Sequence, residues 1–266
     1  MLNQDNYETM DIDRRDNGIV VVTLNRPDRL NAINGTLHAE LARFSRDFAD
    51  DRELRVLVLT GAGRAFSAGG DFSPGDAIGS NPSGPSLWVE ARQIVDHLLA
   101  CEKPLISAVN GYAMGLGANV ALLCDVVVAG PNTVFADTHV NMGIGAGDGG
   151  QLIWPFLIGV NRAKYYLMTG DRVTGKEAVE MGLANFYVDD KDEVLPKALE
   201  VAERLAAGAP KAISASKMAV NAYLRSIASV VMPICLQHEE LTMQTEDHRE
   251  AVAAFQEKRA PSFKGK

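Results

Sequence analysis

Residues 104–119, PLISAVNGYAMGLGAN, join a short apolar run to a passage with glycines at positions 111, 115 and 117. The run at 104–109 is aliphatic throughout and predicts a buried strand of a parallel sheet. The glycine passage lets backbone approach a ligand closely, and it leads into a helix predicted at about 118–123. Because ligands bind at the carboxyl ends of the strands in open α/β sheets, this stretch predicts an α/β fold with a site where the strand ends.

The same pattern extends outward along the chain. Further strands are predicted at 19–24, 55–60, 125–129, 133–135 and 186–188. Helices are predicted at 87–101, 150–158, 161–169 and 175–182, and another has Leu37, Leu41, Phe44 and Phe48 on one face and Thr36 as its N-cap. From residue 194 the pattern is entirely helical, with breaks at 206–210 and near Pro233. We therefore predict an α/β core over residues 1–205 and a helical region over 206–266.

Composition narrows the class of protein. The 266 residues are 47% hydrophobic and 23% charged, which is typical of a globular protein, and the net charge of −8 argues against a nucleic-acid partner. The three cysteines are too few and too scattered for a disulfide framework or a metal site, so we expect a cytoplasmic protein without a bound metal. The polar, acidic start is unlike a signal peptide, and no apolar run suggests a membrane span, so no membrane partner is expected.

A second glycine passage, GRAFSAGGD at residues 63–71, also follows a predicted buried strand. Backbone N–H groups that converge from two such passages would bind the oxyanion that develops in carbonyl chemistry. The alternative is that these glycines only turn the chain.

Together these segments resemble the crotonase, or enoyl-CoA hydratase/isomerase, family over nearly the whole chain. The similarity includes LNRP at 24–27, LTG at 59–61, AFSAGGD at 65–71, AVNGYA at 108–113, CD at 124–125, LMTG at 167–170 and AVEMGL at 178–183. The resemblance implies a spiral of ββα units with a C-terminal helical region used in trimer formation. The many apolar residues of that region also favour a homotrimer or a homohexamer.

The resemblance further implies an acyl-CoA substrate, with coenzyme A entering as part of that substrate and no separate cofactor. Its thioester oxygen would be held by the backbone N–H groups of Ala68 and Leu116. The other residues expected to bind the substrate are Arg29, Ala65, Phe66, Gly69, Asp71, Gly115, Lys258 and Lys264. The three cations among them are the candidates for contacts with coenzyme A phosphates.

The catalytic positions depart from the family pattern. Hydratases of the family carry two glutamates where this chain has Asn119 and His139. Asn119 cannot take a proton but could orient a water or a carbonyl. His139 could act as a general acid or base, and Asp148, nine residues later in a glycine-rich loop, could fix its tautomer or act as a base itself. The alternatives are a structural histidine and a helix N-cap, and His38 is predicted to be structural.

Three functional hypotheses follow. The first is an acyl-CoA enzyme that works through an enolate, such as an enoyl-CoA hydratase. The second is a hydrolase of carbon–carbon bonds in β-diketones, because that branch of the family also has a His followed nine residues later by an Asp in a Gly-Asp-Gly loop. The third is a non-catalytic acyl-CoA-binding protein, which the ionisable His139 and Asp148 disfavour.

Overall fold

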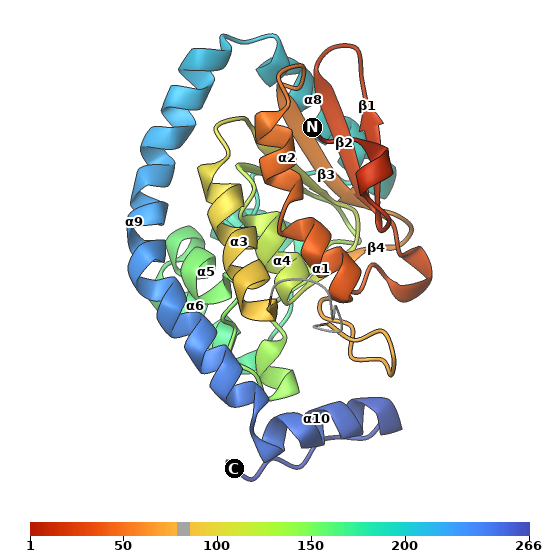
Figure 1. Ribbon diagram of the computed structural model, residues 1–266, viewed down its shortest axis with the longest axis vertical. Coiled ribbons are helices and arrows are strands. Elements are labelled where there is room, and N and C mark those ends of the chain that lie inside the picture. The colour runs from red at the N-terminus through yellow and green to blue at the C-terminus, as the bar shows by residue number, and fades with distance from the viewer. Residues whose placement is uncertain (79–85) are drawn as a thin grey trace.

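The computed structural model describes residues 1–78 and 86–266, and its larger sheet has six strands, of which Figure 1 labels β1, β2 and β3. The strand order is β1-β2-β3-β5-β7-β10, with β1 antiparallel to β2 and the other neighbours parallel. The bounds are β1 Met10–Arg14, β2 Ile19–Leu24, β3 Val56–Gly61, β5 Leu105–Val109, β7 Val126–Ala129 and β10 Phe186–Tyr187. The predicted strands at 19–24, 55–60, 104–109, 125–129 and 186–188 are confirmed, whereas β1 was not predicted.

A second, smaller sheet has the order β4-β6-β8-β9, with bounds Ala65–Ser67, Tyr112–Met114, Val134–Ala136 and Val173–Thr174. Each of β3, β5 and β7 lies in the first sheet and is followed by β4, β6 or β8 in the second. A helix then follows each pair, so the α/β fold with ββα units is confirmed. The strands β4 and β6 lie inside the two glycine passages, and at three residues each they are too short to show a strand pattern in the sequence.

Both faces of the first sheet are covered, which explains its continuous apolar runs. Along β2, Ile19 and Val21 face a cluster built on Ala198 and Ala202 of α8 (Val194–Ala206), while Val20 and Val22 face the main core. The main core also receives α1 Gly35–Leu41, α2 Phe44–Asp50, α3 Leu87–Ala100, α4 Leu116–Leu122, α5 Gly150–Ile158, α6 Val160–Thr169 and α7 Gly175–Met181. Short 3-10 turns occur at Gln4–Asn6, Pro27–Arg29, His139–Met142 and Lys191–Glu193.

The helix predicted across 37–48 is wrong in two respects. It is interrupted between Leu41 and Phe44, so that α1 and α2 are separate helices. Its N-cap is Asn34 rather than Thr36, because the Asn34 side chain accepts a hydrogen bond from the Leu37 N–H at 3.0 Å.

The C-terminal region consists of α9 (Pro210–Met243) and α10 (Glu246–Glu257), after the break that follows α8. Figure 1 shows α9 along one side of the molecule next to α3, with α10 at the end of the molecule far from α8. The break predicted near Pro233 is wrong, because Pro233 lies inside α9. The buried neighbours Met232 and Cys235 anchor the helix on both sides of the missing backbone donor.

Among the described residues, α9 is the one helix long and apolar enough to cross a membrane by length and composition. Its most apolar 18-residue window has a mean hydropathy of 1.5, and 22% of that window is buried. The expectation that no apolar run suggests a membrane span is therefore wrong for α9. Soluble proteins also contain helices of this kind, so the finding by itself does not indicate a membrane.

Gly117, in α4, is the contact point between α4 and β4. A Cβ atom at Gly117 would lie 2.6 Å from the Cβ of Ser67, a buried strand residue that has no room to move. We expect Gly117→Ala to lower the free energy of unfolding by about 1–3 kcal/mol through overpacking, as measured by urea denaturation. Gly145→Ala is the control, since the nearest atom to its new Cβ would be 3.8 Å away. Equal stability of the two variants would contradict this account of the α4–β4 contact.

Candidate active site

A cavity of about 40 Å³ lies between α3, the start of α4, the turn His139–Met142 and α9. We call it the central cavity. Its lining includes backbone from both glycine passages, at Gly70, Gly115 and Leu116, and the side chains of His139, Asp148 and Glu239. The structure therefore brings the two glycine passages and the predicted His–Asp pair to one place.

Two backbone N–H groups at this cavity are free to bind a ligand. Leu116 is the first residue of α4, and its N–H has no acceptor within the described part of the chain. The same is true of the Gly70 N–H, again counting only residues 1–78 and 86–266. Two free donors that line one cavity are the arrangement required to hold an oxyanion.

The predicted donor Ala68 is wrong. Its N–H donates to the carbonyl oxygen of Leu30 at 2.9 Å, and Ala68 does not line the central cavity. The segment after β4 pairs with residues 30–33, and in a regular strand every second N–H group of this segment would bond to them. Gly69 has a φ of +86°, and this left-handed residue breaks the alternation. As a result Asp71 rather than Gly70 makes the next bond, to Ile33, and Gly70 is left as the free donor.

His139 lies between two aspartates. Its Nδ1 is 2.6 Å from Oδ1 of Asp137, and its Nε2 is 3.0 Å from Oδ2 of Asp148. Carboxylates only accept hydrogen bonds, so both ring nitrogens must carry a proton and the ring is an imidazolium cation. Burial would lower the pKa of His139, but the charges of Asp148 and Asp137 outweigh it and raise the pKa well above its ordinary value.

Asp148 is ionised in this arrangement. Burial alone would raise its pKa, but the charge and the hydrogen bond of His139, together with a hydrogen bond from Asn119, hold that pKa below its ordinary value. The helix-cap alternative is wrong, because α5 begins at Gly150 with Gly149 as N-cap and without a side-chain cap. The Asp148 carboxylate is directed to His139 and Asn119 instead.

Asn119 forms hydrogen bonds with both aspartates that flank His139, but it does not line the cavity. Its Nδ2 donates to Asp148 at 2.8 Å and to Asp137 at 3.2 Å, and its Oδ1 accepts from Trp154 Nε1 at 3.2 Å. The side chain is fully buried and is not part of the cavity lining. The prediction that Asn119 contacts the reacting groups is therefore wrong, and its role here is to position two aspartates.

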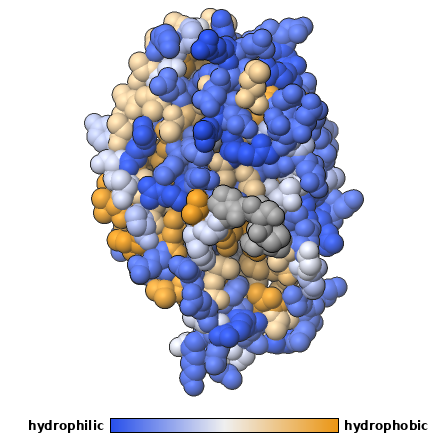
Figure 2. Space-filling view, in the orientation of Figure 1, coloured by the Kyte–Doolittle hydropathy of each residue, from blue (hydrophilic) through white to orange (hydrophobic). Residues whose placement is uncertain are grey.

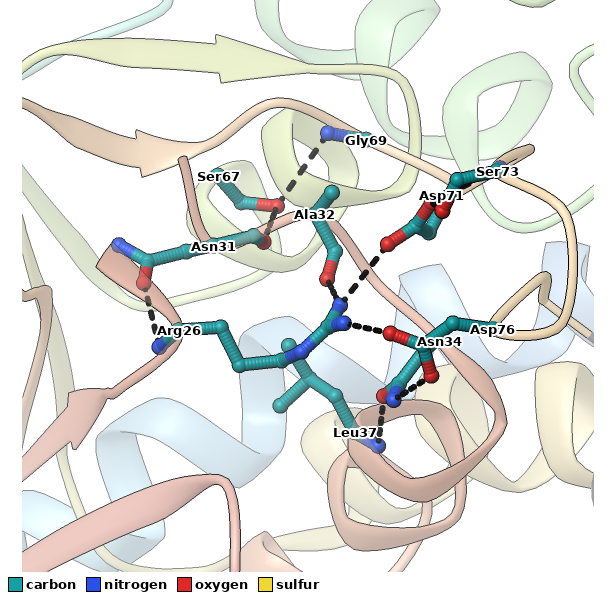
Figure 3. A network of polar contacts seen from close by, with 10 residues as sticks. All are labelled: Arg26, Asn31, Ala32, Asn34, Leu37, Ser67, Gly69, Asp71, Ser73 and Asp76. Carbon is teal, nitrogen blue, oxygen red and sulfur yellow. Dashed lines mark hydrogen bonds and ion pairs between the residues drawn. The ribbon is translucent and has the colours of Figure 1, made fainter. Parts of the chain in front are cut away.

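The residues predicted to bind substrate in the glycine passage at 63–71 mostly stabilise the loop (Figure 3). Ala65 and Phe66 are buried in β4, and Gly69 donates its N–H to Ser67 Oγ at 3.3 Å. Asp71 accepts from Ser73 N–H at 3.0 Å and pairs with Arg26 at 3.2 Å. Arg26 also bonds Ala32 and Asp76, so one guanidinium joins this loop to residues 26–34.

The three predicted phosphate-binding cations are exposed. Arg29 lies in the turn just before Leu30, and Lys258 and Lys264 follow or flank α10. The described residues form no ion pair with any of the three side chains, so each has a free charge. Their role in binding a ligand stays a prediction.

Besides Gly70, three residues were not predicted to belong to the site. Asp137 follows β8 directly, and its position two residues before His139 is the one feature of the sequence that could have indicated its place in the site. Glu239 comes from α9, about ninety residues further along the chain, and no local pattern indicates it. His38, predicted to be structural, lines the cavity while its Nδ1 lies 2.7 Å from Glu90, so its other ring nitrogen is left without a described partner.

Among the described residues, one group of side chains could hold a metal ion. Its possible ligand atoms lie within 4.8 Å of one another and belong to His139, Asp148 and Glu239. However, the contact between His139 Nε2 and Asp148 is a hydrogen bond, and its proton occupies the position that a metal would take. The donor set therefore fits a hydrogen-bonded ionic cluster better than a metal site.

Comparison with known proteins agrees with this fold. The family model described as enoyl-CoA hydratase/isomerase matches residues 14–266, and the chain belongs to that family. It is 36% identical to 2,3-dehydroadipyl-CoA hydratase of Escherichia coli K12, over 95% of this chain and 97% of that protein. It is 33% identical to 1,2-epoxyphenylacetyl-CoA isomerase of the same organism, over 94% of this chain and 96% of that protein.

A solved structure is equally similar in fold. The crystal structure of an enoyl-CoA hydratase from Mycobacterium avium subsp. paratuberculosis K-10 superposes with a TM-score of 0.88 at 27% identity, covering 97% of this chain and 99% of that chain. The family is thus established, and its members named here catalyse more than one reaction.

The protonation of His139 can be tested directly. Because its pKa is raised, we expect the ring to remain protonated well above pH 6.5 in an NMR titration of the wild-type protein. Asp137→Asn should bring the titration to lower pH, since one of the two anions is lost. The charged ring stabilises the fold fully below the ordinary histidine pKa, and this contribution is lost as pH rises through the raised pKa. A wild-type ring that titrates near 6.5 would contradict the doubly bonded cation.

Proposed function

We propose that this chain is an enoyl-CoA hydratase-type enzyme that adds water to the double bond of a 2-enoyl-CoA thioester through an enolate. The observation that carries the proposal is the pair of free N–H groups, at Gly70 and Leu116, in the same cavity as an ionised carboxylate. The thioester oxygen would accept from both donors, and these bonds strengthen as the oxygen becomes an enolate. The names of the relatives, a hydratase and an isomerase of acyl-CoA compounds, support this substrate class.

In this proposal Asp148 is the group that accepts a proton from water. Its carboxylate lines the cavity, and His139 and Asn119 fix its orientation by hydrogen bonds of 3.0 and 2.8 Å. As the water oxygen bonds to C3, its proton passes to Asp148 and the electrons of the double bond move to the thioester oxygen. His139 keeps its proton and acts as a fixed cation that holds Asp148 in place.

The rest of the substrate would bind at the surface beside the glycine passage at 63–71. Arg29, Lys258 and Lys264 would contact the phosphates of coenzyme A, which is carried in by the substrate, so the enzyme requires no separate cofactor. The three buried, unpaired cysteines suit a reducing compartment such as the cytoplasm.

Asp148→Asn tests the role of the carboxylate. The amide has the same shape but cannot accept the proton, so we expect turnover of a short 2-enoyl-CoA to fall about 10²–10⁴-fold with an unchanged melting temperature. Combining it with His139→Ala should cost little more than the worse single variant, because the two residues act as a unit. The exposed Asp189→Asn is the control. Wild-type turnover in Asp148→Asn would show that this carboxylate is not the base.

Hydrolysis of a carbon–carbon bond in a β-diketone is the second candidate function, and the His139–Asp148 contact of 3.0 Å favours it. Incubating the protein with a panel of acyl-CoA thioesters and cyclic β-diketones, followed by mass spectrometry, separates the two. A gain of one water without loss of the thioester indicates hydration, and ring opening indicates the hydrolase. Thermal stabilisation by acyl-CoA without any turnover would indicate a binding protein.

We further propose a homotrimer or homohexamer that is assembled through the region 206–266. Several large apolar side chains of α9 are exposed, namely Val220, Tyr223, Ile227, Val230, Ile234 and Leu241. Figure 2 shows apolar surface on the side of the molecule where α9 runs in Figure 1. An exposed apolar patch of this kind marks an interaction surface, and further copies of the chain would cover it in the proposed assembly.

Val230→Asp tests this assembly. Val230 is 66% exposed, so the new charge is harmless in a single chain but would be buried between copies. We expect light scattering to report a trimer or hexamer for the wild type and a monomer for the variant. The control, Asn17→Asp in the exposed β1–β2 turn, should keep the wild-type mass. A wild-type monomer at micromolar concentration would contradict the assembly.

A further inference from the structure

Glu239, on α9, is a buried carboxyl group that has no role in the hydration mechanism proposed above. It is 7% exposed, and it lines the central cavity together with Gly70, Leu116 and Asp148. Within the described part of the chain, its Oε2 is buried and has no hydrogen-bond partner. An ionised carboxylate without a partner is very costly to bury, so a neutral acid is the form that fits this position.

The glycine loop that holds Asp148 also places Glu239. A Cβ atom at Gly147 would lie 2.6 Å from Oε2 of Glu239 and 2.5 Å from the carbonyl oxygen of Cys235, so only glycine allows the loop to lie this close to α9. The loop is tied to the same helix by the Gly145 N–H, which donates to Thr242 Oγ1 at 3.0 Å. As a result a carboxyl oxygen of Glu239 lies within 4.8 Å of the ligand atoms of Asp148 and His139.

The groups around Glu239 give it a higher pKa than that of Asp148. Burial and the negative charges of Asp148 and Asp137 raise the pKa of Glu239 to about 8, against a smaller opposite effect of His139. Cys235 lies one turn earlier on α9, and His38, paired with Glu90, lines the same cavity. Two neighbouring carboxyl groups, one ionised and one neutral near pH 7, form a base and an acid.

We propose that Glu239 is the catalytic acid of this site, the group that gives a proton to C2 of the substrate. The inference rests on the proposed hydration, in which Asp148 takes the proton of water as the hydroxyl group bonds to C3. The enolate then takes the proton of Glu239 at C2, its oxygen becomes the thioester carbonyl again, and Glu239 is left as a carboxylate. A proton passes from Asp148 to Glu239 across the short gap between them, so one water is consumed and both groups return to their starting state.

Glu239→Gln is the central test, because the amide keeps the shape but has no proton to give. We expect kcat for a 2-enoyl-CoA to fall about 10²–10⁴-fold while KM stays near the wild-type value. The loss of wild-type kcat as pH rises through about 8 should disappear in the variant. Glu239→Asp should recover part of kcat, and the exposed neighbour Glu240→Gln is the matched control. A Glu239→Gln variant with wild-type kcat and an unchanged pH profile would overturn the inference.

A second measurement separates this inference from the proposed hydration. Exchange of the C2 proton of a saturated acyl-CoA with D₂O requires enolate formation and reprotonation but no water addition. If the wild type hydrates no 2-enoyl-CoA, the hydratase proposal fails, and the inference stands only if the wild type catalyses this exchange and Glu239→Gln does not. Exchange that is equal in the two proteins would overturn the inference. So would activity that is lost on dialysis against EDTA and restored by a divalent cation, since Glu239 would then be a metal ligand.

Discussion

The balance of charge around His139 is the constraint on which the rest of the site depends. Asp137 and Asp148 are both almost fully buried, and two uncompensated carboxylates so close together would repel each other strongly. The single cation between them, at 2.6 and 3.0 Å, compensates one negative charge and leaves the group with one excess negative charge. Burial disfavours an ionised carboxylate at Glu239, and that excess negative charge disfavours it further, so Glu239 is the neutral acid beside the ionised Asp148. One imidazolium thus keeps Asp148 ionised in spite of its burial.

The same cluster links the two parts of the fold. Asp137 and His139 follow β8 in the α/β core, Asp148 lies in the glycine loop before α5, and Glu239 comes from the C-terminal helix α9. Because Gly147 lies directly against α9, the position of this helix determines the shape of the central cavity. The helical region is therefore part of the site as well as the proposed assembly surface. A change that displaces α9 would alter the chemistry even where the core stays folded.

The sequence predicted the parts of the structure that follow from local patterns. The buried strands β2, β3, β5 and β7 were found because continuous apolar runs mark strands covered on both faces. Strands β4 and β6 were missed because three residues between glycines carry no periodicity. The site followed the same rule: the pairing of His139 with Asp148 could be anticipated from their spacing in one loop, whereas Glu239 is brought in only by tertiary packing. Gly70 replaced Ala68 as a free donor because of the φ of one residue, Gly69, and this angle is not encoded in the spacing of the motif.

The asparagine at position 119 becomes understandable once the surrounding acids are known. The family resemblance implies a glutamate there, and the sequence alone presents its replacement as a loss of catalytic capacity. In the structure, however, the Asn119 amide donates to both Asp137 and Asp148, and its carbonyl oxygen accepts from Trp154. A carboxylate could not donate either bond, and it would place a further negative charge at a fully buried position beside two others. The acidic groups at the cavity come instead from Asp148 and Glu239. An amide at position 119 is what allows the two aspartates to lie side by side, so the departure from the family pattern at this position and the presence of Asp148 are two parts of one arrangement.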